Sequence, residues 1–472
     1  GRRVMLKRSA VWPRGGAFLA LAILLAPHHV PSTSGLPVQG PKEGEKAWNS
    51  PENDLFRKLG GGQGREEKAD QGFTKSKIPF VVDVPPVVLV PGIGGSIMVD
   101  PKSQLRVWIR LYEAEYYFKR FMWGVWNSTT RTLDPLKGQP RVEPLLTGHG
   151  LDAIRNLDPS VHWPIYDYVS YFDSIITTLE YNGWVPGLNL FGVPWDWRQS
   201  MCWPQTLERL KETVLKAQRL NQGRKVKLVS HSMGALVMKC FIATYPEVAE
   251  QTIGSWVSVA APWQGASAKI YTELLQGYNL GNIVLDPACA KGVSMVSPSV
   301  YELLPSGTFD WVDPPLINLR MQGVPLSFKP SGPQRYDIPM RNANLNYTVV
   351  LPDSGTVLPE GFNEECFALS EESRDRIRSV DLPPGVKFYN VYGVNQTTPL
   401  MMDYGSVSDW AELMTKEVRF FSGDGDGTVS TESARSHGLK AAGELPVDST
   451  HVGMLMDKVV LSYVYDFLYD RL

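Results

Sequence analysis

The sequence has little of several features that would place it at once in a familiar class. Its 472 residues include only four cysteines and seven histidines, and the formal net charge is −2. A charge this close to zero gives no electrostatic reason to expect a nucleic-acid partner. Four cysteines allow at most two disulfides and leave their pairing open. We found no internal repeat and no heptad run, and a 43% hydrophobic composition is typical of a globular chain with a sizeable core.

Long apolar runs are also scarce. The run that precedes the main body, Gly15–Ala26, follows several arginines and lysines and contains about a dozen residues, too few to span a bilayer comfortably. This pattern suits a secretory signal peptide, so we expect residues 1–30 to be a signal peptide or an N-terminal anchor. Potential N-glycosylation sequons fit a secretory route, in which the protein would be secreted, lumenal or vacuolar/lysosomal; they lie at Asn127, Asn346 and Asn395.

Residues 31–77 are rich in Gly, Pro, Lys and Glu and have few large apolar side chains. Such a segment cannot bury enough surface to order itself, so it is predicted to be a flexible linker. The main body, residues 78–472, alternates short apolar strands with amphipathic helices, beginning with a strand at Val87–Val90. This alternation predicts an α/β fold with a doubly wound, mostly parallel sheet.

Two regions interrupt the alternation. Residues 105–126 carry eight aromatic side chains among Arg, Lys and Glu, and residues 266–380 form a long mixed segment between two clear strands. A connection that long inside a compact domain is usually a lid, a cap or a subdomain. We therefore expect a lid at about 101–135 and a cap at about 266–380, although the aromatic residues of the first segment could instead be ordinary core.

The most informative stretch is KVKLVSHSMGALVMKCF, Lys225–Phe241, in which a strand pattern runs through Ser-His-Ser-Met-Gly into a helix pattern. Strand, small-residue turn and helix together are typical of a nucleophile elbow, which would place Ser232 at the tip of the bend. The amide of Met233 would then point into the site from the helix N-terminus. The usual first glycine is replaced by Ser230. Cys240, in the helix, is expected to be a small buried apolar residue.

A serine hydroxyl needs a base, and the base needs an orienting acid. In the fold to which the nucleophile elbow belongs, the acid and then the histidine follow the serine along the chain. Asp424 and Asp426 come directly after a predicted strand, and His451 lies in a loop that opens onto the last helix. His437 stands in a segment predicted to be an exposed helix, which makes it the weaker candidate. His231 is predicted to face the core.

The acidic stretch has other interpretations. A calcium-binding EF-hand loop would need a further acid at Thr428 and a glycine at Val429, so that interpretation fails. A simple glycine-rich turn remains possible. The stretch PGIGGS after the first strand places backbone amides near the predicted bend, and Ile93 or Gly94 could donate a second hydrogen bond to an oxyanion.

With these pieces together, the chain resembles the lecithin–cholesterol acyltransferase family, and within it most closely the plant-type phospholipases. The resemblance runs from about Pro85 to the C-terminus. Several ordered motifs carry it: PPVVLVPGIGGS, RVWIRL, HGLDAIRNLDPS, LFGVPWDWRQS, VSHSMGALV, VSVAAPWQGAS, GDGDGTVS and the isolated His451.

By position, the resemblance implies an α/β-hydrolase fold with Ser232 as nucleophile, Asp426 as the orienting acid and His451 as base. It assigns the oxyanion donors to the backbone of Ile93 and Met233. It also aligns Trp108 and its aromatic neighbours, including Trp123 and Trp126, with the family's mobile lid, and residues 266–380 with its cap. Animal members close the lid with a disulfide, but this chain has no cysteine before Cys202.

The resulting hypothesis is a serine acyl hydrolase or O-acyltransferase that acts on glycerophospholipids at a membrane or lipid surface, with no metal and no cofactor. Water or a lipid alcohol, such as a sterol or diacylglycerol, would accept the acyl chain. Two alternatives stay open: a catalytically silent lipid-binding protein of the same fold, and a soluble esterase. The sequence does not decide between sn-1 and sn-2 cleavage, or between head groups.

Overall fold

The structure is a computed structural model that describes residues 83–472, apart from 112, 162–165, 278–284, 314, 322–362 and 409. The predicted signal peptide or anchor, the predicted linker and Asn346 lie outside the described residues. Among the helices of the described part, none combines the length and the hydrophobicity that crossing a bilayer requires.

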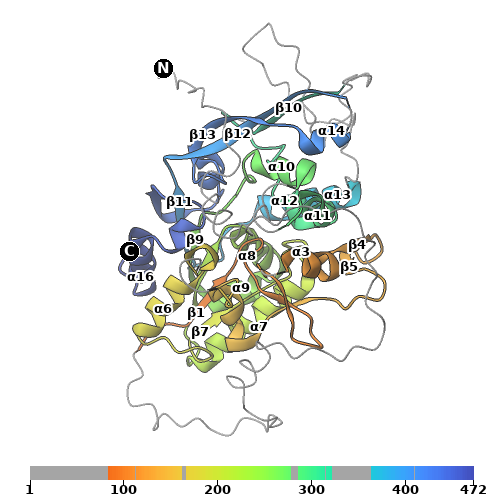
Figure 1. The fold of residues 1–472 in the computed structure, drawn as a ribbon. Coiled ribbons are helices and arrows are strands. Elements are labelled where there is room, and N and C mark those ends of the chain that lie inside the picture. Colours follow the sequence, from red (N-terminus) through yellow and green to blue (C-terminus); the bar gives the residue numbers. More distant parts are fainter. Residues whose placement is uncertain are drawn as a thin grey trace, which may run out of the picture. The chain divides into compact units, whose positions relative to one another are not determined.

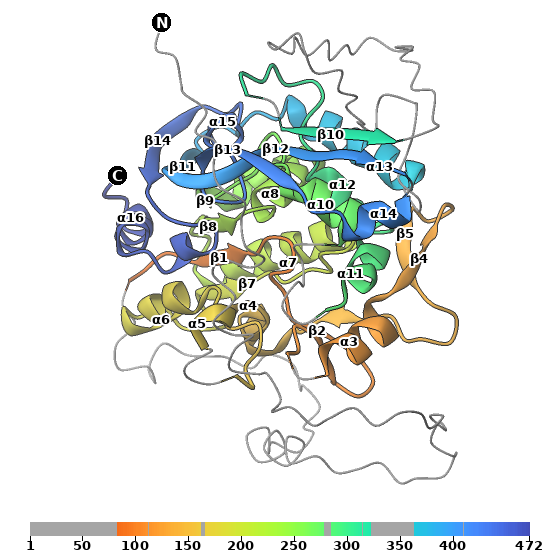
Figure 2. The same cartoon turned by 45° about the horizontal axis from the view of Figure 1, so that its top comes forward.

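The described residues are built on a six-stranded sheet in which every neighbouring pair is parallel (Figures 1 and 2). The first strand occupies the predicted range, Val87–Val90. The four strands from Ile253–Val259 to Leu190–Gly192 are almost entirely buried and rich in Val and Leu, as expected where helices cover both faces of a sheet. In spatial order the strands are β14 (Ala441–Val447), β11 (Lys387–Gly393), β9 (Ile253–Val259), β8 (Val226–His231), β1 (Val87–Val90) and β7 (Leu190–Gly192).

The order of these strands fixes where a site can form. From β1 the chain crosses to β7 on one side and then returns to β8 on the other, so the direction of winding reverses between β1 and β8. In open α/β sheets, ligands bind beyond the carboxyl ends of the strands at such a switch point. Here the two carboxyl ends lead into the glycine loop, residues 91–95, and into Ser232. The predicted α/β-hydrolase fold class is confirmed by this architecture.

Helices cover the sheet on both faces. Alternate residues of the strands point to opposite sides, so Val88 and Leu228 join one hydrophobic cluster while Leu89 and Val229 join the other. The first cluster includes helices α7 (Pro204–Leu220), α8 (Gly234–Thr244) and α9 (Pro246–Thr252). The second includes α4 (Asp152–Arg155), α6 (Asp173–Tyr181) and α16 (Lys458–Leu468), and the short helix α5 (Tyr166–Val169) precedes α6.

The C-terminal third departs from the predicted alternation. The sequence pattern had indicated that the strand in the stretch EVRFFSGDG belongs to the parallel sheet. This strand, β13 (Arg419–Gly425), instead lies in a separate sheet. It pairs antiparallel with β12 (Gln396–Val407), which in turn pairs with β10 (Leu316–Met321). The helices α14 (Trp410–Thr415) and α15 (Thr431–Arg435) flank this small sheet. Strand periodicity alone does not specify which sheet a strand joins.

The predicted lid, residues 101–135, is called the lid segment below. It contains β3 (Arg106–Trp108), α3 (Ala114–Tyr117), a π-helical turn at Phe118–Met122, and the hairpin of β4 (Gly124–Asn127) and β5 (Thr132–Pro135). Strand β3 pairs with β2 (Met98–Val99), which also pairs with β6 (Glu143–Pro144). Short 3₁₀ turns lie at Thr147–Gly150 and Gly453–Leu455.

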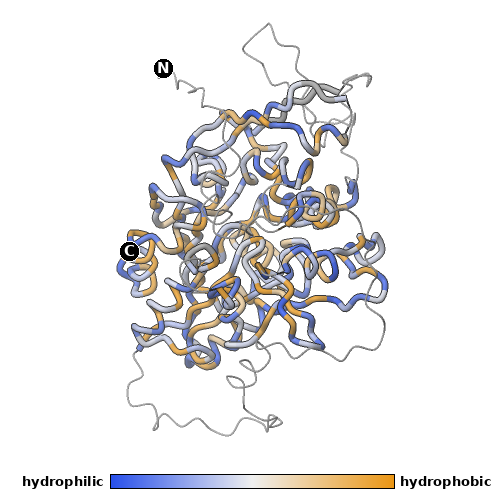
Figure 3. The backbone as a smooth tube through the Cα atoms, in the orientation of Figure 1, coloured by the Kyte–Doolittle hydropathy of each residue, from blue (hydrophilic) through white to orange (hydrophobic). Residues whose placement is uncertain are grey.

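The predicted cap, residues 266–380, is called the cap segment. Its described parts include α10 (Lys269–Gln276), α11 (Pro287–Ser294), α12 (Pro298–Glu302) and α13 (Glu364–Arg378). Helix α13 is rich in charged and polar residues, whereas α8 is almost entirely apolar and buried. In the hydropathy view of Figure 3, hydrophobic stretches gather in the middle of the described part. Asn363 caps α13 by accepting a hydrogen bond from the Cys366 amide.

Two predictions about single residues need correction. Cys240 is completely buried, as predicted, but it is not merely an apolar residue, because it forms a disulfide with Cys202, 38 residues earlier, with a Cα–Cα distance of 5.2 Å. His437 is 7% exposed and follows the end of α15, so it is not on a solvated helix. Its Nδ1 accepts from the Leu439 amide, and its Nε2 lies 2.9 Å from Glu444 Oε1. The local sequence pattern indicated neither the disulfide partner of Cys240 nor the hydrogen-bond partners of His437.

Candidate active site

Ser232 occupies a sharp corner between β8 and α8. Its backbone φ is 53°, in the left-handed region that non-glycine residues rarely adopt. Its amide donates to Val259 O at 2.9 Å, which ties the corner to the end of β9. Gly234 is needed at the next turn because a Cβ there would lie 2.5 Å from Val90 O. The sequence pattern therefore produces the strained bend that a nucleophile elbow requires.

Ser230, which stands where the elbow pattern usually has glycine, has a structural partner. Its hydroxyl accepts a hydrogen bond of 2.8 Å from Trp256 Nε1, and the residue is completely buried. A buried indole N–H needs an acceptor. The serine supplies it, which explains in physical terms why this departure from the pattern is tolerated.

The structure brings together the three side chains predicted for the catalytic centre. Ser232 Oγ lies 2.9 Å from His451 Nε2, and His451 Nδ1 lies 2.7 Å from Asp426 Oδ2. The carboxylate can only accept, so Nδ1 carries the imidazole proton and Nε2 is left to accept from the serine hydroxyl. Ser232 and His451 are 219 positions apart in the sequence, so only the fold brings them together.

Asp426 is held firmly in place. It is 1% exposed, and its Oδ1 accepts from the amides of Thr428 at 2.8 Å and Val429 at 2.7 Å. Burial raises the pKa of the Asp426 carboxyl, but His451 and these amide donors outweigh burial and lower its pKa overall. The His451 amide also donates to Asp426 O at 2.9 Å, which joins the loops of acid and base. Asp424 lies within β13 and bonds instead to Asn395 and Thr431.

The glycine loop lies close to Ser232, and Met233 follows Ser232 at the start of α8. A Cβ on Gly92 would lie 2.7 Å from Ser232 Cβ and 3.2 Å from its Oγ, so only glycine allows this approach. Among the described residues, neither the Ile93 amide nor the Met233 amide donates to a protein acceptor. Both amides are therefore available to an oxygen bound beside Ser232.

The three tryptophans assigned to the lid take up different positions. Trp108 is 5% exposed and donates to Gly94 O at 3.0 Å, and its ring packs against Trp197, so it anchors the glycine loop from the core. Trp123 and Trp126 lie further along and are only partly buried. The core interpretation thus fits Trp108, whereas the other two lie where the lid segment meets the cap segment.

Hydrogen bonds from side chains of the lid segment join it to the cap segment. Trp123 Nε1 donates to Cys289 O at 3.1 Å, on α11. Trp126 donates to Glu365 on α13. Arg131 forms two hydrogen bonds of 2.8 Å with Glu372, also on α13. None of these links is a disulfide: they are hydrogen bonds, one of which belongs to the Arg131–Glu372 ion pair.

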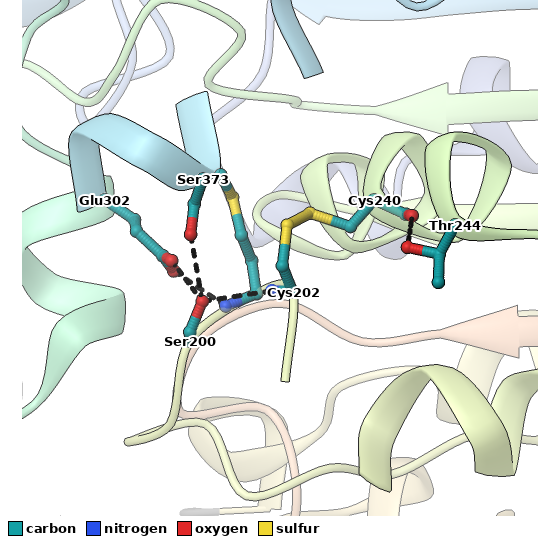
Figure 4. Close-up of a disulfide and its surroundings, with 7 residues drawn as sticks. Ser200, Cys202, Cys240, Thr244, Glu302 and Ser373 are labelled. Carbon is teal, nitrogen blue, oxygen red and sulfur yellow. Dashed lines mark hydrogen bonds between the residues drawn. A yellow bond between two sulfur atoms is a disulfide. The ribbon is translucent and has the colours of Figure 1, made fainter. Parts of the chain in front are cut away.

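The disulfide lies beside a buried carboxyl group, as Figure 4 shows. Glu302, at the end of α12, accepts from Ser200 Oγ at 2.5 Å and from the Met201 amide at 2.7 Å. Ser200 Oγ is also 3.2 Å from Ser373 Oγ on α13. Burial raises the pKa of Glu302 to about 7, although its hydrogen-bond donors act in the opposite direction. This cluster attaches the cap segment to the loop before Cys202.

No group of three or more His, Cys, Asp or Glu suited to a metal occurs in the described ranges.

The sequence had given no reason to single out Tyr171, which lies against the glycine loop and hydrogen-bonds to His231. His231 is 2% exposed, as its predicted inward position requires. A tyrosine between a strand bridge and a helix carries no motif, so only the fold reveals its place.

The parallel sheet, its switch point and the strained corner at Ser232 define the class: the protein is an α/β-hydrolase. Comparison with known proteins narrows this further. A family model described as "Lecithin:cholesterol acyltransferase" matches residues 121–348. "Phospholipase A(1) LCAT3" of Arabidopsis thaliana is 30% identical over 415 residues, which cover 82% of this chain and 91% of that protein. "Lysosomal phospholipase A and acyltransferase" of Homo sapiens is 26% identical over 411 residues, covering 80% and 89%.

The chain belongs to the lecithin:cholesterol acyltransferase family, and it is an enzyme of that family. Among solved structures, the crystal structure of the Tle4–Tli4 complex matches with a TM-score of 0.47 and 13% identity, covering 82% of this chain and 98% of that chain. The fold assignment rests on the strand order and the corner described above.

Proposed function

We propose that the protein cleaves acyl esters of glycerophospholipids through an acyl intermediate on Ser232 and passes the acyl group to water or to a lipid alcohol. The observation that carries the proposal is the chain of contacts from Ser232 Oγ to His451 and on to Asp426, at 2.9 and 2.7 Å. The names of the Arabidopsis and human relatives support phospholipids as the substrate class.

In the proposed first step, Ser232 attacks the ester carbonyl while its proton moves to His451 Nε2. Asp426 holds Nδ1–H and stabilises the imidazolium. The amides of Ile93 and Met233 would donate to the tetrahedral oxyanion, and loss of one such donor typically costs about 3–4 kcal/mol of transition-state stabilisation. His451 then protonates the leaving oxygen, so a lysophospholipid departs and an acyl ester of Ser232 remains.

In the second step, His451 takes a proton from the acceptor, whose oxygen attacks the acyl carbonyl. The bond between that carbonyl and Ser232 Oγ then breaks, and His451 returns the proton to Oγ. Water gives a fatty acid, and a sterol or diacylglycerol hydroxyl gives a transferred ester. The lid and cap segments are proposed to cover the acyl chain, with Trp123 and Trp126 at their contact. Access for a lipid surface would then require the links to Cys289 and Glu365 to open. We expect a secretory or lysosomal-type compartment, on the basis of the N-terminal segment and the human relative's name.

The test uses phosphatidylcholine labelled differently in its two acyl chains, in vesicles with and without a sterol or diacylglycerol. The wild type should release labelled fatty acid and a lysolipid, and the label that leaves identifies the position cleaved. Ser232→Ala should leave only about 10³- to 10⁴-fold catalysis over water. The control is Ser230→Gly, which removes a neighbouring hydroxyl that bonds to Trp256 and should keep most of the activity.

Other outcomes separate the alternatives. A wild-type protein that binds the vesicles but releases no product, and does not react with a fluorophosphonate, would be a lipid-binding protein. Cleavage of monomeric esters without cleavage of vesicle lipid would indicate a soluble esterase. Activity of Ser232→Ala at the wild-type level would refute the acyl-serine mechanism.

A further inference from the structure

Two buried polar side chains outside the proposed triad connect the glycine loop to the loop of His451. The Gly92 amide donates to the Tyr171 hydroxyl at 2.9 Å. The same hydroxyl lies 2.7 Å from His231 Nδ1, and His231 Nε2 lies 3.0 Å from His451 O. Tyr171 is 4% exposed and His231 2% exposed, so water does not compete for these bonds.

The donor and the acceptor of each hydrogen bond in this series can be assigned from the two backbone groups at its ends, the Gly92 amide and the His451 carbonyl. The carbonyl of His451 can only accept, so Nε2 of His231 carries the proton. Nδ1 of a neutral His231 must then accept, and the Tyr171 hydroxyl donates to it. The Gly92 amide donates to the remaining lone pairs of that hydroxyl oxygen. Three hydrogen bonds therefore run in one direction, from the amide before Ile93 to the backbone of the proposed base.

Packing gives the tyrosine ring a second role. A Cβ on Gly95 would lie 2.7 Å from Tyr171 Cε1 and 2.9 Å from its hydroxyl oxygen. The ring thus fills the space that a side chain on Gly95 would need. It touches the loop at the same time as its hydroxyl holds the Gly92 amide, so the loop that approaches Ser232 rests on Tyr171.

His231 stays neutral in this environment. Burial, and then the proximity of His451, lower the pKa of His231 to about 3. The two imidazole rings have centroids 5.0 Å apart. A charged His231 would repel the imidazolium that His451 forms during the reaction, whereas a neutral His231 holds the backbone of His451 without that cost. The other groups that face His231 are Tyr171, Phe172 and, through its charge, Asp426.

We propose that Tyr171 and His231 are positioning residues that fix the oxyanion donors of the glycine loop and the base His451 relative to each other. This inference rests on the proposed function. Neither side chain touches the reacting atoms. Their contribution is to keep the glycine loop and the loop of His451 in one geometry at the moment when charge develops beside both.

The experiment measures kcat and KM for phosphatidylcholine cleavage, with the active fraction counted by fluorophosphonate titration. Tyr171→Phe keeps the ring against Gly95 and removes only the hydroxyl. His231→Leu removes both hydrogen bonds, and His231→Gln restores one donor and one acceptor on a neutral side chain. Tyr404→Phe is the matched control, because Tyr404 is 2% exposed and its hydroxyl donates to Gln276 at 3.1 Å.

Displacement of a group near the reacting atoms by about 1 Å can cost about 10²-fold, so we expect kcat of Tyr171→Phe to fall about 10- to 100-fold with KM within about twofold. His231→Gln should be several-fold more active than His231→Leu. The double variant Tyr171→Phe/His231→Leu should be no slower than the slower single variant, because both substitutions interrupt the same series of hydrogen bonds. Tyr404→Phe should lose stability but keep kcat.

A packing role alone predicts the opposite order, because leucine suits a buried site better than glutamine does. Equal kcat in Tyr171→Phe and the wild type would overturn the proposal, as would His231→Leu equalling or exceeding His231→Gln. If Tyr171→Phe does not fold, the comparison of the two His231 variants decides alone. A wild type that titrates with fluorophosphonate but does not cleave lipid would instead count against the proposed function.

Discussion

The corner around Ser232 and the contact between the lid and cap segments are held by different kinds of bond. At the corner, Asp426 and His231 are at most 2% exposed, and each makes hydrogen bonds with a fixed direction. Across the contact, Arg131 and Glu372 pair while their side chains remain 43% and 61% exposed. Buried, directed bonds keep one geometry, whereas exposed pairs exchange readily with water.

This difference suits the role proposed for each region. A site that stabilises developing charge, as proposed for the corner, must be ordered before the substrate arrives. A cover over a lipid site, as proposed for the lid and cap segments, must open and close at little cost, and exposed pairs contribute only about 0–1 kcal/mol each. The disulfide joins the loop before α7, at Cys202, to helix α8, at Cys240. Glu302 of the cap segment accepts hydrogen bonds from Ser200 and Met201 of the same loop.

The largest expected effect is at the corner. Asp426→Asn should lower kcat about 10⁴-fold, because an amide can present a donor to His451 and favour the wrong tautomer. Vesicle assays measure the rate, and thermal unfolding checks that the variant is folded. Glu372→Gln makes the same carboxylate-to-amide change at the exposed contact. A rate for Asp426→Asn within tenfold of the wild type would contradict the difference between the regions.

Gly92→Ala should act next most strongly. The added Cβ would lie 2.7 Å from Ser232 Cβ, so the glycine loop must move away and kcat should fall about 10²-fold. Gly138→Ala is the control, because nothing lies within 4 Å of its Cβ position although its φ is +83°. That variant should lose stability through backbone strain while its kcat stays at the wild-type level. Equal kcat in both variants would mean that the loop is not held close to Ser232.

Replacing both Cys202 and Cys240 by serine should lower the free energy of unfolding by about 2–4 kcal/mol, as expected for a bond that closes a loop of this length. Chemical denaturation measures it. Because α8 still packs in the core, the active fraction that titrates with fluorophosphonate should remain near that of the wild type below the unfolding transition. A loss of titratable serine without unfolding would show that the disulfide shapes the corner itself.

Glu302 should make stability depend on pH. Its pKa is raised from an ordinary 4.5 to about 7 in the folded protein, so the folded state binds the proton more tightly than the unfolded state. The stabilisation is therefore complete below pH 4.5 and is lost as the pH rises through about 7, by about 3 kcal/mol at most. Glu302→Gln should flatten this part of the pH–stability curve. A curve unchanged by the substitution would contradict the assignment.

The smallest effect is expected at the exposed contact. Glu372→Gln should change the free energy of unfolding by less than about 1 kcal/mol and the rate of vesicle hydrolysis by less than about fivefold. Raising the salt concentration should reduce the difference between wild type and variant further, because exposed pairs are screened. A loss comparable with that of Asp426→Asn would show that the contact is as rigid as the corner.

Much of the corner could be predicted from the sequence because local chemistry specifies it. The apolar strand Val87–Val90, the small residues around Ser232 and the glycine at 234 constrain the backbone within a few residues. His451 could be selected because few histidines follow Asp426 along the chain. The structure places these groups together, while their catalytic roles remain predictions for the experiments above.

The remaining features depend on contacts between distant segments. Nothing near Cys240 indicates that Cys202 lies opposite, and nothing near Tyr171 indicates that its hydroxyl meets Gly92. His437 was misjudged because its surroundings come from β14 and α8 rather than from its own segment. Strand β13 has strand periodicity but joins β12, a pairing that only the whole chain determines. Local patterns specify elements, and tertiary packing specifies their partners.

The most direct test of the account is to identify the residue that carries the acyl group. The wild-type protein would be mixed with phosphatidylcholine vesicles, quenched in acid within the first turnover, digested and examined by mass spectrometry. The account predicts one peptide with the mass of an added acyl chain, in ester linkage at Ser232. Product release at the normal rate with no acyl group at Ser232, or with the acyl group on another residue, would contradict it.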